Sequence, residues 1–367
     1  MGLNEDQVIK VFREVKHPET GKSILEMEMV RELVVETGKV SFDLVTTKKK
    51  DPFINSIAKV IERAIQSEID ENIEVSITVK SAFVPRGSEQ EKIILPGVKH
   101  VIAVASGKGG VGKSTMAVNL SVAMAKTGAK VGLIDADVYG PSIPKMFGVE
   151  HLRPHVKKVD NKDLIVPIEK YGVKMLSVGF FVNSSEALVW RGPMATSALR
   201  QLIHDAEWGE LDYLFLDLPP GTGDVHLTIV QEVPVTGAII VSTPQEVALA
   251  DAIKGISMFE SSKINVPVIG LIENMAWFTP KELPGNKYFI FGKEGCKHLA
   301  EKMNLPLLGQ IPIVQDVVES GDSGNPVVLD DNPITLSAFD SLVRNFNAAL
   351  DKRLKEKAPT KRVIINK

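Results

Sequence analysis

The sequence contains a single cysteine, Cys296, among 367 residues. One cysteine excludes a disulfide within the chain and is typical of proteins from a reducing compartment. The first residues, MGLNEDQVIK, lack the basic and apolar regions of a secretory signal, and no apolar run approaches the length of a membrane span. We therefore expect a cytoplasmic protein with no membrane partner.

The sequence also lacks a surplus of charge of either sign. Lys and Arg number 43, and Asp and Glu number 46, for a net charge of -3. This balance indicates no basic surface for nucleic acid. Hydrophobic residues make up 44% of the chain, as in ordinary globular proteins. The length favours two or three domains.

The chain does contain a phosphate-binding motif. The stretch GKGGVGKST fits G-x-x-x-x-G-K-[ST], follows the apolar run VIAVA and precedes a segment with apolar residues at helical spacing. A strand before the motif and a helix after it are the context that a P-loop requires. The alternative, a glycine-rich turn that binds nothing, is disfavoured by this full match in context. The candidate nucleotide ligands are Gly107, Lys108, Gly109, Gly110, Val111, Gly112, Lys113, Ser114 and Thr115.

The chemistry of this motif predicts a bound nucleoside triphosphate and Mg²⁺. Glycines let several backbone N–H groups converge on phosphate oxygens without a Cβ in the way. Lys113 is expected to reach the β- and γ-phosphates, and the hydroxyl of Ser114 is expected to bind Mg²⁺. The N-terminus of the following helix adds its partial positive charge.

Aspartates end two further apolar segments. Segment 130–137 ends in Asp135 and Asp137, and segment 211–218 delivers Asp217. Carboxylates at the carboxyl tips of parallel strands lie where such a sheet binds its ligand. We expect Asp217 to hold Mg²⁺ through water, Asp135 to be a more distant Mg²⁺ partner and Asp137 to orient the attacking water. A helix cap or a solvated loop is the alternative for Asp135 and Asp137.

A glycine-rich turn, PPGTGD, follows segment 211–218 at residues 219–224. Such a turn can donate N–H groups to the γ-phosphate and change conformation when that phosphate leaves. It is therefore predicted to sense the γ-phosphate. Farther along, the apolar segment 266–272 is followed by Glu273 and Asn274, and the amide of Asn274 could pair with an adenine edge.

The alternation of strand-like and helical segments predicts an α/β fold with a mostly parallel, doubly wound sheet. A small α+β domain of helix, hairpin, helix and strand is expected before it, at residues 1–84. Residues 85–95 predict a linker, 96–350 the P-loop domain and 351–367 a basic tail. The apolar face of segment 337–357 favours a helix packed on the sheet, with a membrane-targeting amphipathic helix as the alternative. This face is formed by Phe339, Leu342, Val343, Phe346, Leu350 and Leu354.

These motifs together resemble one family. An additional lysine after the first glycine, Lys108, marks the deviant P-loop of the MinD/ParA class. LIDADVYGPSIPKMFG, WRGPMATSALRQL, LDLPPGTGD, TPQEVALADA and ENMAWF resemble its Mrp/ApbC branch, the iron–sulfur cluster carrier ATPases. The resemblance runs from about Val98 to Pro326. The N-terminal segment is similar to a small domain related to iron–sulfur assembly factors.

The resemblance implies a slow ATPase that works as a homodimer. Lys108 of one subunit would cross to the phosphates bound by the other, as an arginine finger does in trans. ATP, Mg²⁺ and an iron–sulfur cluster are the implied cofactors, and client or scaffold proteins, including iron–sulfur apoproteins, are the implied partners. The resemblance also assigns Asp137 to the attacking water, Ser114 and Asp217 to Mg²⁺, Gly221 and Gly223 to the γ-phosphate, and Asn274 to the base.

One part of the family's pattern is missing. Many members have a C-x-x-C pair after ENM-x-x-F that bridges a cluster in the dimer, but residues 278–286 contain no cysteine. A [4Fe–4S] cluster bound by protein thiolates takes four, and two copies of this chain supply two. Cys296 and His298 cannot share a helix face, so Cys296 is expected to be a partly buried helix residue rather than a cluster ligand.

Two functions stay open at this point. The first is a cluster carrier whose missing ligands come from exogenous thiols, from a partner protein or from other groups. The second is a nucleotide-switched dimer that positions or regulates a macromolecule without a cluster, with the N-terminal domain as its docking surface. A phosphoryl-transferring metabolic enzyme would need an acceptor pocket, which the sequence does not locate.

Overall fold

The computed structural model describes residues 4–36, 38–46, 51–81, 94–159, 162–181, 192–262, 264–280, 282–283 and 285–360. The chain divides into two compact units, Met1–Ile93 and Ile94–Lys367. Most of the expected linker at 85–95, and residues 361–367 of the expected tail, lie outside the described residues.

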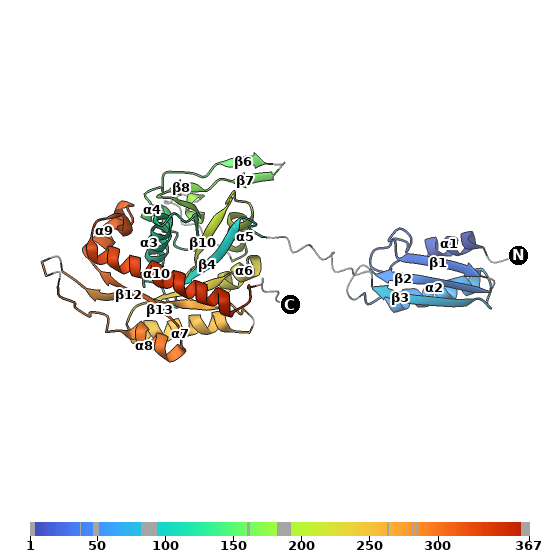
Figure 1. Ribbon diagram of the computed structural model, residues 1–367. Coiled ribbons are helices and arrows are strands. Elements are labelled where there is room, and N and C mark those ends of the chain that lie inside the picture. The colour runs from blue at the N-terminus through green and yellow to red at the C-terminus, as the bar shows by residue number, and fades with distance from the viewer. Residues whose placement is uncertain are drawn as a thin grey trace. The chain divides into compact units, whose positions relative to one another are not determined.

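The N-terminal unit is a small α+β fold, as predicted (Figure 1). In its three-stranded sheet, β1 is antiparallel to β2 and β2 is parallel to β3. Two amphipathic helices bury their apolar faces against this sheet, and a capping box at Asn4 begins the first of them. The elements are α1 (Glu5–Glu14), β1 (Val30–Glu36), β2 (Lys39–Thr46), α2 (Ile54–Glu68) and β3 (Glu74–Ser81).

The second unit is built around an eight-stranded sheet in the order β13-β12-β11-β4-β10-β5-β9-β8. All neighbouring strands are parallel except β8 and β9, which pair antiparallel at one edge. The predicted doubly wound, mostly parallel sheet is therefore confirmed. The strands are β4 (Val98–Ala105), β5 (Val131–Asp135), β8 (Ile168–Lys170), β9 (Val173–Ser177), β10 (Leu211–Asp217), β11 (Gly237–Ser242), β12 (Val268–Phe278) and β13 (Leu307–Ile313).

Helices cover both faces of this sheet, which explains why its central strands are uniformly apolar (Figure 1). Helices α3 (Lys113–Lys126) and α10 (Pro333–Glu356) pack on one face. The other face is covered by α5 (Gly192–His204), α6 (Asp224–Glu232), α7 (Glu246–Glu260) and α8 (Gly295–Met303). The remaining elements are α4 (Ile143–Met146), β6 (Val156–Val159), β7 (Lys162–Ile165), η1 (Val178–Phe180), α9 (Gln315–Ser323) and η2 (Val327–Leu329).

The strand order brings the predicted site segments to one edge of the sheet. Strand β10 lies between β4 and β5, and Asp217 is in register with both Val104 and Asp135. The carboxyl ends of these three strands therefore meet beside the P-loop, which leaves β4. This is the edge at which parallel α/β sheets bind ligands.

The last helix extends farther than the domain boundaries we expected. Asn332 caps α10, which runs to Glu356, so the boundary at residue 350 lies inside a helix. Arg353 is buried, and its guanidinium donates to Ala358 O and Thr360 Oγ1. Leu354, expected on the apolar face, is exposed. The other apolar residues of this face, Phe339, Leu342, Val343, Phe346 and Leu350, are buried against the sheet.

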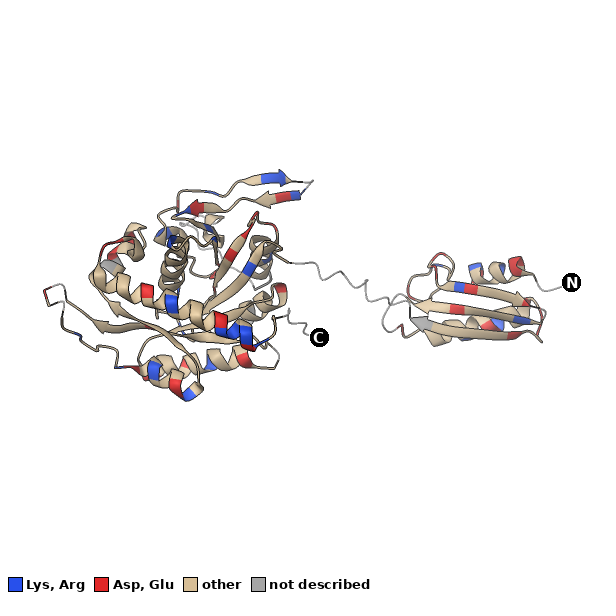
Figure 2. Ribbon diagram, viewed as in Figure 1, with Lys and Arg blue, Asp and Glu red and all other residues tan. Residues whose placement is uncertain are grey.

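Residues of both charges are interspersed along the helices and strands (Figure 2). This distribution agrees with the near-balanced charge of the sequence. Across the part of the chain that the structure describes, none of the helices combines the length and the hydropathy that crossing a membrane would require.

The P-loop lies directly against the backbone of α7, and Gly107 makes this approach possible. A Cβ at Gly107 would overlap the backbone carbonyl of Asp251 and the N atom of Ala252. Backbone atoms of a packed helix cannot move aside as a flexible side chain can. By contrast, a Cβ at Gly255 on the same helix would meet no atom within 4 Å.

This contrast gives a matched pair of substitutions. Gly107→Ala is expected to destabilise the protein by about 1–3 kcal/mol, because either the P-loop or α7 must shift. Gly255→Ala is expected to stabilise it by up to about 1 kcal/mol, because alanine restricts the unfolded chain and favours helix. Urea unfolding of both variants measures these changes, and equal stabilities would contradict the close approach.

Candidate functional site

The P-loop joins β4 to α3 and ends with its lysine at the start of the helix. Gly112 is the N-cap of α3 with a φ of 80°, and a Cβ there would overlap the amide of Asn274. Glycine is favoured at this position on both grounds. The turn places the unpaired N–H groups of the first helical turn and Lys113 at one end of α3, which is the arrangement that binds phosphate.

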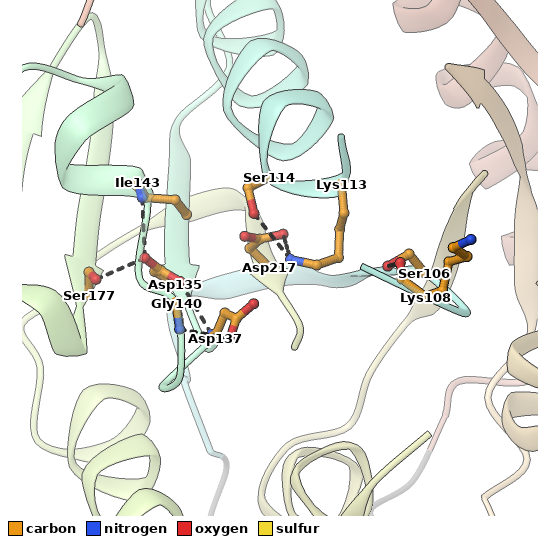
Figure 3. A network of polar contacts seen from close by, with 10 residues as sticks. All are labelled: Ser106, Lys108, Lys113, Ser114, Asp135, Asp137, Gly140, Ile143, Ser177 and Asp217. Atoms are coloured by element: carbon orange, nitrogen blue, oxygen red, sulfur yellow. Dashed lines mark hydrogen bonds and ion pairs between the residues drawn. The ribbon is translucent and has the colours of Figure 1, made fainter. Parts of the chain in front are cut away.

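Lys113 is paired with Asp217 in the interior. Lys113 Nζ lies 2.6 Å from Asp217 Oδ1 and 3.2 Å from Ser114 Oγ, and both charged side chains are buried (Figure 3). Two charges at this depth are tolerated because each compensates the other. The structure thus brings together three of the residues expected to bind phosphate and Mg²⁺.

The second oxygen of Asp217 provides a test of whether Mg²⁺ fits. Asp217 Oδ2 is buried and has no hydrogen-bond partner among the described residues. Burial raises the pKa of this carboxyl, and the charge and hydrogen bond of Lys113 oppose that rise. An unpartnered carboxylate oxygen beside a serine hydroxyl is the oxygen-donor set that Mg²⁺ prefers. Ser114 and Asp217 would therefore hold the ion, which would neutralise phosphate charge and orient the γ-phosphate.

Asp135 accepts hydrogen bonds from three donors, and the Mg²⁺ role expected for it stays a prediction. Its Oδ1 accepts from the N–H of Asp137 at 3.2 Å, while Oδ2 accepts from Ser177 Oγ at 2.9 Å and Ile143 N at 3.3 Å. Burial and the charge of Asp217 raise the pKa of Asp135 to about 7. These contacts favour Asp135 as the residue that holds the loop from β5 to α4, which carries Asp137.

Asp137 and the PPGTGD turn face the same region from two loops. Asp137 Oδ1 accepts from Gly140 N at 3.2 Å and is partly exposed, so the carboxylate has access to solvent (Figure 3). In the turn, Gly221 N donates to Ser106 O at 3.0 Å. This bond ties the turn to the residue before the P-loop. Binding of the γ-phosphate by Gly221 would require the bond to open.

Lys108 points away from the Lys113–Asp217 pair (Figure 3). Its backbone carbonyl accepts from Ser106 Oγ at 3.0 Å, and the side chain is partly exposed. Among the described residues, no carboxylate forms an ion pair with it. In this position the ammonium group of Lys108 does not lie beside Lys113 in its own subunit (Figure 3).

Asn274 contacts the P-loop. It is buried within β12, which continues beyond it to Phe278, and it donates from Nδ2 to the carbonyl of Val111 at 2.9 Å. The bond connects β12 to the turn that holds the phosphates. The expected contact between Asn274 and the base of the nucleotide stays a prediction.

Cys296 lies in the first turn of α8 with none of its surface exposed. Its N–H donates to Glu273 Oε2 at 2.6 Å, and Gln310 Nε2 donates to Oε1 of the same carboxylate at 2.7 Å. Burial, reinforced by the nearby charge of Glu273, raises the pKa of the Cys296 thiol well above its usual range. The chain's one thiol is therefore neither accessible nor ionised.

Within the described residues, no group of three or more His, Cys, Asp or Glu side chains is arranged to hold a metal ion.

Sequence reasoning missed two residues of this site. Ser177 ends β9, a short strand with the sequence VKMLS that gave no clear signal, and it reaches Asp135 only because β9 pairs with β5. His226 follows the PPGTGD turn on α6 and is buried beside it. The adjacency of His226 to the turn is visible in the sequence, but its burial is not.

The fold and this site define the chain as a P-loop NTPase. Residues 97–347 match the model of the NUBPL iron-transfer P-loop NTPases, and residues 5–79 match that of an iron–sulfur cluster assembly protein family. The chain belongs to the NUBPL iron-transfer P-loop NTPase family.

Individual relatives agree with this assignment. An iron–sulfur cluster carrier protein of Synechocystis is 42% identical over 89% of this chain and 92% of its own length. The nucleotide-binding protein of Archaeoglobus fulgidus, solved with ADP, is 38% identical, with a TM-score of 0.57 over 68% of this chain and 96% of that one. The MinD cell division ATPase of Pyrococcus furiosus shares the fold at 21% identity, with a TM-score of 0.50 over 68% of this chain and 98% of that one.

The Lys113–Asp217 pair predicts how a substitution at Lys113 acts. Lys113→Ala is expected to abolish ATP binding and to lower the free energy of unfolding by about 3–5 kcal/mol, because Asp217 is left buried without its counter-ion. A double variant, Lys113→Met with Asp217→Asn, removes both charges and is expected to regain most of that stability without regaining nucleotide binding. Urea unfolding and titration with a fluorescent ATP analogue measure the two effects. Wild-type ATP binding by Lys113→Ala would contradict the site.

Proposed function

We propose that this chain is a slow, Mg²⁺-dependent ATPase that works as a homodimer and carries iron–sulfur clusters to apoproteins. The observation that carries the ATPase part is the buried Lys113–Asp217 pair beside Ser114, with Asp217 Oδ2 unpartnered. Family membership and the name of the Synechocystis relative, whose length is covered almost completely, support the carrier part.

Each residue of the site has its own role in the proposed hydrolysis. Lys113 and the N–H groups of the P-loop bind the phosphates, while Ser114 and Asp217 hold Mg²⁺. Asp137, partly exposed at the tip of β5, orients the water that attacks the γ-phosphate. Gly221 and Gly223 bind the γ-phosphate through their N–H groups, and Asn274 lies near the base.

Lys108 is the residue that makes the proposed reaction depend on a dimer. Its side chain is directed away from the phosphate-binding lysine of its own subunit (Figure 3). Across a two-fold interface the same side chain would meet the phosphates of the second subunit, where a cation stabilises the charge of the transition state. A monomer would then bind ATP but hydrolyse it slowly.

The cluster is proposed as a substrate whose ligands come largely from outside the chain. Cys296, the one cysteine, is fully buried and its pKa is raised. Iron–sulfur clusters need accessible thiolates or equivalent donors. Small thiols or the cysteines of a client apoprotein would supply these donors while the dimer positions the client.

The buried thiol of Cys296 also favours a second candidate function. A dimer that closes over ATP and opens after hydrolysis could position or regulate a macromolecular partner without any cluster, with the N-terminal unit as the docking surface. The inaccessible Cys296 is the specific observation behind this alternative.

The dimer mechanism predicts the behaviour of Lys108→Ala. This variant is expected to bind ATP within a few-fold of wild type and to lose about 10³-fold in turnover, the low end of the effect measured for arginine fingers. Lys99→Ala, which removes an exposed lysine from the start of β4, is the control that keeps full activity.

A mixing experiment separates action in trans from action in cis. Neither Lys108→Ala nor Lys113→Ala should hydrolyse ATP alone. A mixed dimer contains one site with an intact Lys113 that receives Lys108 from the other subunit, so mixing should restore hydrolysis. A mixture that stays inactive would show that Lys108 acts within its own subunit.

The cluster hypothesis predicts that reconstitution needs added thiol donors. After anaerobic incubation with iron and sulfide, stoichiometric cluster is expected only with dithiothreitol, glutathione or an apoprotein acceptor present, and equally in Cys296→Ala and Cys296→Ser. Iron counting and absorption spectroscopy measure this. A thiol-independent cluster that disappears in both variants would make Cys296 a ligand, and no cluster under any condition would favour the nucleotide switch.

A further inference from the structure

The three donors that converge on the buried carboxylate of Asp135 differ in where they come from (Figure 3). Two of them, Asp137 N at 3.2 Å and Ile143 N at 3.3 Å, are backbone groups of the loop after β5 and of the helix α4 that ends it. The third is Ser177 Oγ at 2.9 Å, at the end of β9. The carboxylate therefore connects the loop to a strand of the central sheet.

Ser177 is the one donor of the three that lies on a sheet strand. Its Cα is in register with that of Asp135, because β9 pairs in parallel with β5, so the sheet fixes the separation of the two side chains. Ser177 Oγ accepts from Gly179 N at 3.0 Å, which leaves its own proton to be donated to Asp135 Oδ2. The side chain is completely buried, so solvent cannot replace this donor.

A second contact joins the end of β9 to the same loop. The turn η1 begins directly after Ser177, and a Cβ at Gly179 would lie 3.1 Å from Pro141 Cβ and 3.2 Å from Ser177 Oγ. The glycine therefore lets the turn pack closely against the loop that carries Asp137. The hydroxyl and the turn together limit how far this loop can move from the tip of β9.

We propose that Ser177 is a positioning residue for ATP hydrolysis: by fixing the carboxylate of Asp135 it sets the place of the loop, and with it the place of Asp137. The inference rests on the proposed function, in which Asp137 orients the attacking water. The Asp137 carboxylate accepts from Gly140 N at 3.2 Å, a bond within the loop, so its position depends on that of the whole loop. Displacement of a reacting group by about 1 Å can cost about 100-fold in rate.

Ser177→Ala tests this role through a split between turnover and nucleotide binding. The kcat for ATP hydrolysis is expected to fall about 10- to 100-fold, because Asp137 is no longer held in place. The Kd for a non-hydrolysable ATP analogue with Mg²⁺ is expected to stay within about twofold of wild type, since β5 and β10 separate β9 from the strand that leads into the P-loop.

Two further variants control for lost packing. Ser177→Cys keeps the side-chain volume but is only a weak donor, so it is expected to lose turnover as Ser177→Ala does. Ser121→Ala removes an equally buried hydroxyl, which donates to Ala117 O within α3, and is expected to keep wild-type turnover.

Amide hydrogen exchange gives a readout that needs no ATP. Because Asp137 N and Ile143 N bond to Asp135, exchange in the peptide 136–146 of the full chain is expected to be at least about tenfold faster in Ser177→Ala. Gly179→Ala is expected to act in the same direction, since its Cβ would displace either Pro141 or the serine hydroxyl. Ser121→Ala should leave exchange in this peptide unchanged.

The outcomes separate this inference from the ATPase proposal. Unchanged exchange in Ser177→Ala, faster exchange with wild-type kcat, or loss of nucleotide binding in proportion to turnover would each overturn the positioning role, even where wild type hydrolyses ATP. Faster exchange in a protein whose wild-type form does not hydrolyse ATP would support the hold of Ser177 on the loop while the ATPase proposal fails. If Ser177→Ala does not fold, the same measurements on Ser177→Cys decide.

Discussion

The ion pair between Lys113 and Asp217 is the interaction on which the site depends. Both charges are buried at the edge of the sheet, and neither would be tolerated there alone. In the proposed ATPase, binding of Mg·ATP would exchange the partner of each charge: the lysine would turn to the phosphates and the aspartate to Mg²⁺. The nucleotide and its metal would then compensate both buried charges, so neither would be left without a counter-charge.

The parts of the site that the sequence predicts are those determined by local chemistry. The P-loop, the strand-ending Asp217 and the PPGTGD turn can each be recognised from a few consecutive residues. The fold class follows from the alternation of strands and helices in the same way. What could not be predicted depends on strand order. Asp135 binds Ser177 because β9 pairs with β5, and no local pattern specifies that neighbour.

The same distinction applies to the hydrogen-bond partners of Asp135. An aspartate at a strand tip beside a P-loop looks like a metal partner, and periodicity cannot show which donors surround it. In the structure three donors occupy its two oxygens and connect the tips of β5 and β9 to α4. His226 shows the complementary case, since its position in the sequence is evident but only tertiary packing makes it buried.

Coupling between the nucleotide and a partner can begin at the bond from Gly221 N to Ser106 O. This bond closes the PPGTGD turn onto the end of β4, and a γ-phosphate that recruits the Gly221 N–H must open it. The turn leads directly into α6, which packs against α5 on the face of the sheet opposite α3. Opening this one hydrogen bond would therefore shift the start of α6. Hydrolysis and phosphate release would return α6 to its first position. The two positions of the helix would then correspond to the two nucleotide states.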